Sequence, residues 1–404
     1  MSSPVSPAAP LFREVSATGD GRDISQEYCA SLGLLQPQDS VLQEKGGDYV
    51  VYEEVLRDDQ VASTFQQRRL AVTSAEWGVR PGGPDRASRR AADHLQALLQ
   101  SIGWDGVTDK MLYGVFFGYA VAECLWEREG REILLAAIKV RKQRRFAFDE
   151  TGELRLRLRG EPQGEKLPPR KFWHFCTGAD HDDEPYGLGL AHWLYWPVYF
   201  KRNGIKLWLI FMDKFGMPTA RGTYPVNASE EEKRRLLAAL RAIQTDSGII
   251  VPEGMRIELI EAARGGQVHY EAFVDRMNAA IAKVVLSQTL TTDAAGGLYK
   301  AEVQKSVRNE VVRADADLVC DTFNRSVARW LTEWNHPGAT PPQVWRRVRE
   351  ESDLRPQAER DKILFSMGFR PTLAYVRETY GEGWEGPDSG VDDHQERNRI
   401  RFGV

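Results

Sequence analysis

The residues whose types and spacing best suit chemistry are two histidines and a run of acidic side chains. His174 lies shortly before the segment Asp180-His-Asp-Asp-Glu184. Imidazole nitrogens and carboxylate oxygens together bind divalent metal ions, so His174, His181 and Asp182 are candidates for a metal-dependent nucleic-acid enzyme. The segment is also typical of a polar loop before a helix, because Pro185-Tyr-Gly favours a turn. We prefer the loop interpretation and assign no metal ligand and no catalytic residue.

A second candidate site is the most basic region of the chain. Such a region, with aromatic side chains beside it, is typical of a surface that contacts a phosphate backbone. Alternating arginines also occur on the solvated face of a strand and in salt bridges between subunits, and we prefer that interpretation. The aromatic residues of 172–211 are likewise expected to form core or subunit interface rather than a base-stacking platform. The basic region comprises Lys139-Val-Arg-Lys-Gln-Arg-Arg145, Phe146, Phe148, Arg155, Arg157 and Arg159.

The sequence lacks the signatures of a nucleotide-driven motor and of a serine hydrolase. It contains neither Gly-x4-Gly-Lys-Ser/Thr nor Gly-x-Ser-x-Gly. The glycine pairs Gly265-Gly266 and Gly296-Gly297 lack the lysine and hydroxyl that hold phosphates and Mg²⁺. We therefore predict a protein that is not an enzyme and that uses no cofactor.

The composition is that of a globular protein with no overall attraction for nucleic acid. The 404 residues suffice for two or three domains, and 42% of them are hydrophobic. The net charge of −4 provides no general basic field. The four cysteines lack the spacing of a zinc site, so reduced thiols are expected. The N-terminus does not resemble a signal peptide, and the apolar runs 114–122 and 207–212 are shorter than the ~20 residues that span a bilayer. A soluble protein with no membrane partner is expected.

The elements that must position these residues mix helices and strands, so we expect the α+β class. Ser229-Glu-Glu-Glu232 is a capping box that begins a helix over 229–245, and Pro197 is expected to kink a helix or delay its start. Periodicity predicts further helices over 52–70, 85–101, 108–127, 188–215, 271–288, 301–335, 356–367 and 371–380. It predicts strands over 71–79, 133–140, 145–148, 154–159, 172–175, 249–251, 256–260 and 343–349.

A hinge at 289–300 separates two of the amphipathic helix patterns. Its residues are small, polar and paired in glycine, which is typical of a mobile surface loop. The helix that follows, 301–335, has a length of roughly 50 Å at about 1.5 Å per residue. A long rigid helix beside such a loop favours a mechanical part over a catalytic pocket.

Four sequence motifs identify a family. Together they resemble, in the same order along the chain, the portal (head-to-tail connector) proteins of Mu-like tailed bacteriophages and prophages. The resemblance covers about residues 45–380, and the family's usual Leu-Gly-Gln-Thr-Leu reads Leu286-Ser-Gln-Thr-Leu290 here. The motifs are Glu184-Pro-Tyr-Gly-Leu-Gly189, Asp213-Lys-Phe-Gly-Met-Pro218, Ser247-Gly-Ile-Ile-Val-Pro-Glu-Gly254, and Ile281-Ala-Lys-Val-Val-Leu-Ser-Gln-Thr-Leu-Thr-Thr292 with Gly296-Gly297.

The resemblance implies a portal fold with a mixed α/β wing, a helical stem, a small β clip and a helical crown. Mapped onto this chain, the expected parts are a flexible arm at 1–25, the wing at 26–228 and stem helices within 229–288 that enclose the clip at 246–270. A channel loop at 289–300, the long helix at 301–335 and the crown region at 336–404 complete the mapping.

The resemblance also implies a function. Portal proteins form a ring, expected here to have about twelve subunits, at a unique capsid vertex of the virion, and double-stranded DNA passes through it during packaging and ejection. The implied partners are the major capsid protein, the terminase large subunit and a head-completion or adaptor protein, with assembly in the host cytoplasm. The expected DNA-proximal residues of the channel loop are Thr291, Thr292, Asp293, Gly296, Gly297 and Lys300. The expected docking residues of the clip are Pro252, Glu253, Arg256 and Glu258.

Two other classes stay open from the sequence. One is the metal-dependent nucleic-acid enzyme, and the other is a smaller head–tail adaptor, which also forms rings without catalysis. Adaptors are usually much shorter and lack the Gln288-Thr-Leu-Thr hinge, so the portal interpretation is preferred.

Overall fold

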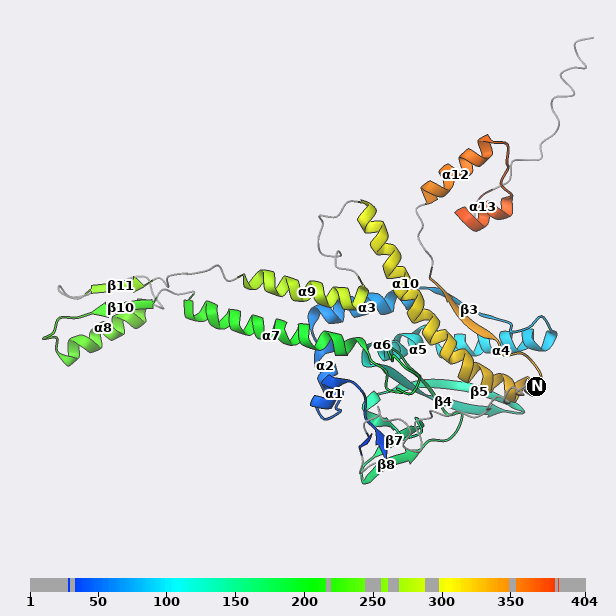
Figure 1. Cartoon of the computed structure of the whole chain (residues 1–404), viewed down its shortest axis with the longest axis horizontal. Helices are drawn as coiled ribbons and strands as arrows, with labels where there is room; N and C mark the ends of the chain where they lie inside the picture. The colour runs from blue at the N-terminus through cyan, green and yellow to red at the C-terminus, as the bar shows by residue number, and fades with distance from the viewer. Residues whose placement is uncertain are drawn as a thin grey trace, which may run out of the picture. The chain divides into compact units, whose positions relative to one another are not determined.

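The computed structural model describes residues 28–29, 33–215, 219–243, 256–260, 269–287, 298–348, 354–381 and 384 (Figure 1). The chain divides into two compact units, one ending at Val348 and the other beginning at Arg349. Both the helices and the sheets of the predicted α+β class are present.

The first half of the first unit contains short helices around small antiparallel sheets. Its helices are α1 (Ser40–Glu44), α2 (Val50–Leu56), α3 (Asp59–Thr73), α4 (Arg86–Ile102), α5 (Trp104–Met111) and α6 (Tyr113–Phe117), with a 3-10 turn at Gln143–Arg145. Its strands are β1 (Tyr28–Cys29), β2 (Leu34–Leu35), β3 (Glu76–Arg80), β4 (Tyr119–Glu129), β5 (Glu132–Arg141), β6 (Phe146–Phe148), β7 (Leu154–Leu158), β8 (Glu161–Lys166) and β9 (Phe172–Cys176).

Five further helices, including the two of 26 residues, are described in the second half of that unit. They are α7 (Leu190–Phe215), α8 (Glu230–Ile243), α9 (Tyr270–Leu286), α10 (Leu298–Phe323) and α11 (Arg329–Asn335), with strands β10 (Thr219–Thr223), β11 (Arg256–Ile260) and β12 (Gln343–Arg347). The sheets have the strand orders β5-β4-β9, β6-β7-β8, β12-β3, β10-β11 and β1-β2, and every pairing is antiparallel.

The central strand β4 corrects one prediction, because the sequence pattern assigned a helix to 108–127. Helices α5 and α6 occupy only its first part, and the chain then turns at Gly118, whose φ is +102°. A Cβ at Gly118 would lie 2.6 Å from the backbone oxygen of Tyr186, so only glycine fits this turn. Beyond it, Ala120 and Ala122 face one hydrophobic cluster and Val121 faces the other. A strand buried on both faces is apolar throughout, and periodicity alone does not distinguish it from a helix.

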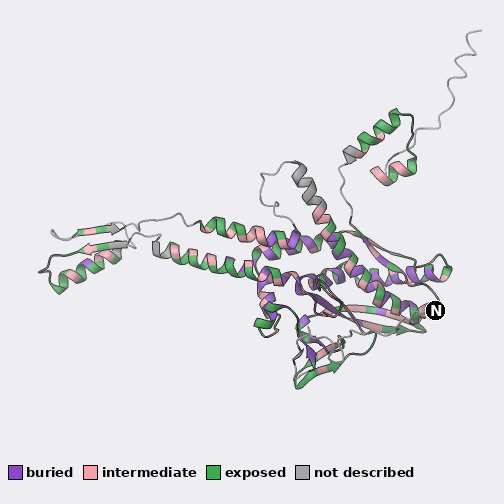
Figure 2. Ribbon diagram, in the orientation of Figure 1, coloured by how far each residue is buried: buried purple, intermediate pink, exposed green. Residues whose placement is uncertain are grey.

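The two hydrophobic clusters lie on opposite faces of β4. The first cluster surrounds Trp104, Trp173 and Phe323, and it includes the inner face of α10. The second cluster includes Tyr119 and Tyr186 and lies beneath the first half of α7. Figure 2 shows both clusters as buried segments of the body, whereas much of the outer half of α7 is exposed.

Other boundaries are confirmed or moved by local chemistry. The predicted helix 52–70 is broken at Asp58, whose carboxylate accepts the Gln60 and Val61 amide protons and caps α3. The strand predicted over 71–79 begins only at Glu76. The capping box is confirmed, because the Ser229 hydroxyl and the Glu232 carboxylate exchange hydrogen bonds with each other's backbone N–H groups.

The long helix after the hinge is confirmed, with two changes. It begins at Leu298, so Lys300 lies in α10 and not in the predicted loop. It also contains a π-helical turn over Asn324–Ala328, which joins α10 to α11. The Asn324 amide donates to the Val344 carbonyl and accepts from the Val344 N–H, which holds β12 against the helix.

Helices α8 and α9 pack on different elements. Helix α9 packs along α7, whereas α8 packs on β10, where Gly222 leaves room for Leu236 and Leu240. Strand β11 pairs with β10. The predicted strand 249–251 lies outside the described residues. The packing therefore pairs α9 with α7, and the assignment of 229–245 and 271–288 to the stem stays a prediction.

The second unit contains two helices, α12 (Leu354–Ser366) and α13 (Leu373–Tyr380). The Tyr375 and Tyr380 hydroxyls both donate to the Asp361 carboxylate and join the helices. These helices confirm the predictions at 356–367 and 371–380.

Candidate functional site

Helix α7 is the most unusual surface of the molecule, because its two sides are both apolar. Ala191, Leu194 and Val198 recur at helical spacing and are buried against the second cluster. The opposite side carries Trp193, Trp196 and other large side chains that are exposed. A helix that is apolar all round is normally covered on every side. The exposed set on this side, here called the outer face of α7, is Trp193, Trp196, Tyr199, Phe200, Leu207 and Ile210.

The aromatic rings of this outer face contact one another. The Trp196 and Phe200 rings stack at 27° with centroids 5.8 Å apart, and Trp196 meets Tyr199 edge-on at 5.9 Å. Trp196 nevertheless remains 45% exposed. Contiguous apolar patches of this kind mark interaction sites in soluble proteins.

Farther along, α7 is joined to α9 by close aromatic packing (Figure 1). The Trp208 and Tyr270 rings stack at 7° with centroids 6.1 Å apart. The Phe273 ring packs directly against Gly204, where a Cβ would lie only 2.5 Å from the ring. The two helices therefore form one paired element.

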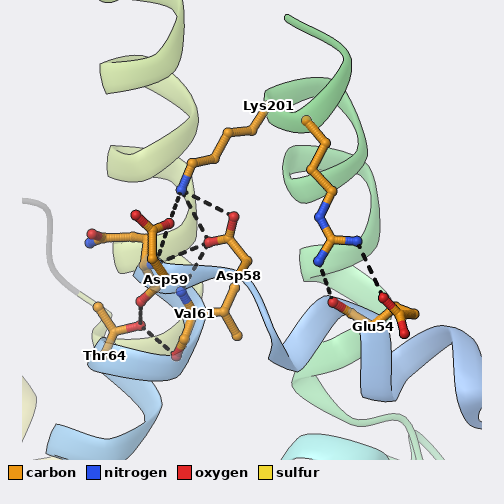
Figure 3. Close-up of polar contacts among 8 residues, drawn as sticks. Glu54, Asp58, Asp59, Val61, Thr64 and Lys201 are labelled. Carbon is orange, nitrogen blue, oxygen red and sulfur yellow. Dashed lines mark hydrogen bonds and ion pairs between the residues drawn. The ribbon is translucent and has the colours of Figure 1, made fainter. Parts of the chain in front are cut away.

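A buried ion pair fixes α7 to the start of α3 (Figure 3). The Lys201 side chain is only 4% exposed, and its Nζ lies 3.1 Å from Asp58 and 2.5 Å from Asp59. The hydrogen bond from Lys201 lowers the pKa of Asp59. Beside it, the Arg202 Nη2 donates to the Glu54 carbonyl at 2.5 Å. Because Asp58 also caps α3, one carboxylate sets the position of both helices.

A second polar cluster fixes the beginning of α7. The Asp39 carboxylate caps α1 and accepts a hydrogen bond from the Tyr52 hydroxyl. It also lies 2.8 Å from the His192 Nδ1, near the start of α7. Burial, with the Asp39 hydrogen bond second, raises the pKa of Tyr52, so this hydroxyl stays protonated.

Arg68 on α3 holds the two helices that flank the predicted channel loop. Its Nε and Nη2 donate to the Asp315 carboxylate of α10 at 2.6 and 2.8 Å. Its Nη1 donates at 2.7 Å to the carbonyl of Val285, in the last turn of α9. One guanidinium therefore positions the end of α9 and the middle of α10 together.

The predicted metal residues have different surroundings. The His174 ring on β9 lies between the Tyr119 and Phe148 rings, and burial lowers its pKa to about 4. The His181 Nδ1 is 2.5 Å from the exposed Asp180 carboxylate, which raises the pKa of His181. Within the described ranges, no cluster of three or more His, Cys, Asp or Glu side chains is arranged as a metal site. Nothing in these residues favours the metal-enzyme alternative.

Glu184, the last acid of that run, is buried and accepts the Tyr186 amide proton at 3.1 Å. Burial raises its pKa to about 7. Together with the turn at Gly187, this fits the loop interpretation, in which the segment leads into α7.

Part of the basic region is paired with acids of the same chain. Arg141 lies 2.6 Å from Glu123, and Lys142 lies 2.7 Å from Glu53. On β7, Arg155 pairs with Asp149 at 2.7 Å. These positive charges are therefore offset within the subunit.

The predicted loop and clip residues lie mostly beyond what the structure describes. Arg256 and Glu258 are on β11 and form an ion pair of 3.2 Å. The others, which lie outside the described residues, are Thr291, Thr292, Asp293, Gly296, Gly297, Pro252 and Glu253.

Sequence reasoning missed Lys201 and Arg68. A signal for Lys201 existed, because it continues the spacing of the buried stripe Ala191, Leu194 and Val198. A charge on an apolar stripe indicates a buried partner.

The fold is that of a phage portal protein. It is similar to a chain in the neck of an empty gene transfer agent (GTA) particle, with a TM-score of 0.59 and 12% identity over 90% of this chain and 97% of that one. A chain of the native GTA virion gives a TM-score of 0.55 at 12% identity, over 81% of this chain and 93% of that one.

The sequence comparisons give the family. The family "Portal protein of Mu bacteriophage" matches residues 49–382, and the chain belongs to it. The chain is 28% identical over 344 residues to the Mu-like prophage FluMu protein gp29 of Haemophilus influenzae, and 30% identical over 279 residues to the portal protein of Escherichia phage Mu. These alignments cover 80% and 67% of this chain but only 65% and 54% of the two relatives. In the described part of the chain, no helix is long and apolar enough to cross a membrane.

Proposed function

We propose that this chain forms a closed homo-oligomeric ring at one capsid vertex of a tailed-phage virion, and that double-stranded DNA passes through its centre. The outer face of α7 carries this proposal. A lone subunit would leave its rings in water, whereas a neighbouring subunit would cover them. Head-to-tail contacts that close by rotation generate such a ring. A subunit number of about twelve is supported by the C12 symmetry used for the neck of the native GTA particle, whose matching chain gives a TM-score of 0.51.

The assignment of parts follows the same proposal. The wing comprises the part of 26–228 outside α7, and the crown region is 336–404. The paired helices α7 and α9 form the stem, with the clip at 246–270. The clip would meet the terminase large subunit and later a head-completion protein. The wing would face the major capsid protein. Assembly would take place in the host cytoplasm.

Weak contact with DNA suits this role, because each strong phosphate contact would hold a moving duplex. The pairing of Arg141, Lys142 and Arg155 within the chain supports a wall of low attraction. The channel loop at 289–297 contains no Lys or Arg and includes Asp293. In this proposal the ring is a conduit and has no ATPase or nuclease activity.

The test is native mass measurement and two-dimensional class averages of the purified chain. We expect a large homo-oligomer with a central hole. The variant Trp196→Glu/Phe200→Glu should yield a folded monomer, because acids on the outer face cannot be buried unpaired. The matched control is Val226→Glu/Leu237→Glu, which places two acids at exposed apolar positions elsewhere and should still form rings.

Two outcomes would contradict the proposal. A wild-type chain that stays monomeric at micromolar concentration would exclude the ring. Metal-dependent DNA cleavage that is lost in His181→Ala or Asp182→Ala would support the enzyme alternative instead.

A further inference from the structure

A cleft rich in arginine lies where β12 and β3 meet α10. Its volume is about 560 Å³, and it lies wholly within the first unit. Strand β12 pairs with β3 and packs on α10, so three segments distant in sequence form its walls (Figure 1). The lining residues are Arg80, Arg313, Asp317, Trp345, Arg346, Arg347 and Val348.

The charges of this cleft are unbalanced. Four guanidinium groups line it, against the single carboxylate of Asp317. Arg346 is offset by Asp105 at 2.8 Å. The Arg80 Nη2 donates to a neutral amide, at 3.4 Å from the Gln343 Oε1. Arg347 stands opposite Glu76 in the β12–β3 pairing. Among the described residues, neither Arg80 nor Arg347 forms an ion pair with a carboxylate.

The cleft is also built on fixed groups. The Arg346 side chain is fully covered, and its Nη groups donate to Thr108 and to the carbonyls of Val72 and Ala75. Its Nε–H is buried and has no acceptor among the described residues. A buried guanidinium with one unused donor therefore lies in the wall of the cleft.

Trp345 orders the exposed side of the cleft. Its indole lies directly on Gly78 of β3, where a Cβ would be only 2.9 Å away. The Arg347 guanidinium lies 5.6 Å from the centre of that ring. Stacking on tryptophan limits the rotamers of Arg347 and reduces the entropy lost on binding a ligand.

We propose that this cleft binds a phosphate oxyanion, either of a nucleic-acid backbone or of a free polyphosphate. Phosphate offers several acceptor oxygens and more than one negative charge, so it can contact Arg80 and Arg347 together, whereas one carboxylate is satisfied by one guanidinium. The proposal does not depend on the ring, because every lining residue belongs to one chain.

The test measures binding of two probes, inorganic pyrophosphate and a short duplex DNA, to the full-length chain. Arg80→Ala/Arg347→Ala should weaken binding by about tenfold or more, since two charge-assisted contacts are lost. For duplex DNA, the slope of log K against log salt should fall by about 1.8, which is two phosphates at about 0.9 each. Arg346 is left intact because it anchors α5.

The matched control is Arg86→Ala/Arg89→Ala, two exposed arginines on α4 that remove the same charge. It should leave both affinities within about twofold. Cleft-dependent binding of pyrophosphate that duplex DNA does not displace would identify a free phosphate compound. Cleft-dependent binding of the duplex with the reduced salt slope would identify the backbone.

Two results would overturn the proposal. One is that neither probe binds, and the other is an equal loss in the cleft variant and the control. Native mass measurement of the same samples reports ring formation separately. Failure of the proposed phosphate binding can therefore be distinguished from failure of the proposed ring formation.

Discussion

Helices α7 and α10 have the same length, 26 residues each, and opposite relations to the rest of the chain. The inner face of α10 presents Val312, Ala316, Val319 and Phe323 to the first cluster, and charged residues such as Arg313 and Asp317 are exposed on its other side. Helix α7 buries one apolar face and exposes a second. Where its side chains are described, α10 therefore has one apolar face, whereas α7 has two, and the proposed ring would cover the second.

The polar anchors of the two helices are alike, which sharpens the contrast. Asp315 on α10 is held by Arg68, and Lys201 on α7 is held by Asp58, and all four side chains are at most 10% exposed. Each helix is thus fixed to α3 by a buried ion pair. The difference lies in the apolar faces, which in the proposed ring would separate folding of the subunit from its assembly.

The largest expected effect tests that separation directly. Phe323→Ala should lower the free energy of unfolding by about 4 kcal/mol, because a fully buried ring beside Trp104 and Trp173 leaves a cavity. Trp196→Ala should lower the free energy of unfolding of the subunit by only about 1–2 kcal/mol, because its ring contacts are with Tyr195, Tyr199 and Phe200 of the same helix, but it should weaken ring formation. Urea unfolding in the Trp196→Glu/Phe200→Glu background measures the first quantity, and native mass of the single variants measures the second.

The comparison would fail if the two effects were exchanged. A large loss of subunit stability in Trp196→Ala would mean that the outer face of α7 is covered by its own chain.

A smaller effect is expected at the anchor of α7. Lys201→Met should lower the free energy of unfolding by about 2–3 kcal/mol, because Asp58 stays buried without its cation. The cost is below that of a fully stranded charge, since Asp58 keeps the Gln60 and Val61 amide donors. The control is Arg202→Met, whose pair with Glu54 is half exposed and should be worth less than about 1 kcal/mol. Equal costs in urea unfolding would show that Lys201 is not the anchor.

The sequence pattern predicted helices α7 and α10 well and strand β4 badly, and one physical reason explains both results. Helical spacing is visible where only one face is apolar, as in α10, or where the run is long, as in α7. Strand β4 serves two cores, so Tyr119–Ala122 is apolar without a readable period. The turn that begins it depends on the close approach of Gly118 to Tyr186, which is a contact between distant segments.

The candidate site was foreseen only in part. The aromatic content of 172–211 indicated core or interface. The structure places part of it in the core and part on the exposed outer face of α7, and the interface stays a prediction. The anchors were not foreseen, because Arg68 and Asp315 are 247 positions apart and neither has a distinctive motif. Pairing at such separations is a property of the tertiary structure.

The smallest expected effect concerns the segment before α7, where two groups titrate in opposite senses. Burial lowers the pKa of His174 from 6.5 to about 4, so between these values the unfolded chain binds more protons and stability falls on acidification. Burial raises the pKa of Glu184 from 4.5 to about 7, so in that interval the folded chain binds more protons and stability rises on acidification. Their contributions oppose each other between pH 4.5 and 6.5.

Removing one of the two groups should therefore leave only the pH dependence of stability that the other contributes. Glu184→Gln should make stability fall with decreasing pH over this interval, with an added slope of at most about 1.4 kcal/mol per pH unit. His174→Phe, which keeps a ring between Tyr119 and Phe148, should add a slope of the opposite sign. The double variant should match the wild-type slope, because the two contributions oppose each other in the wild-type chain and are both absent from the double variant. Urea unfolding at a series of pH values, in the monomeric background, measures all four chains. An unchanged slope in Glu184→Gln would mean that this carboxyl titrates normally and that the segment before α7 is hydrated, unlike the covered segment that the structure describes.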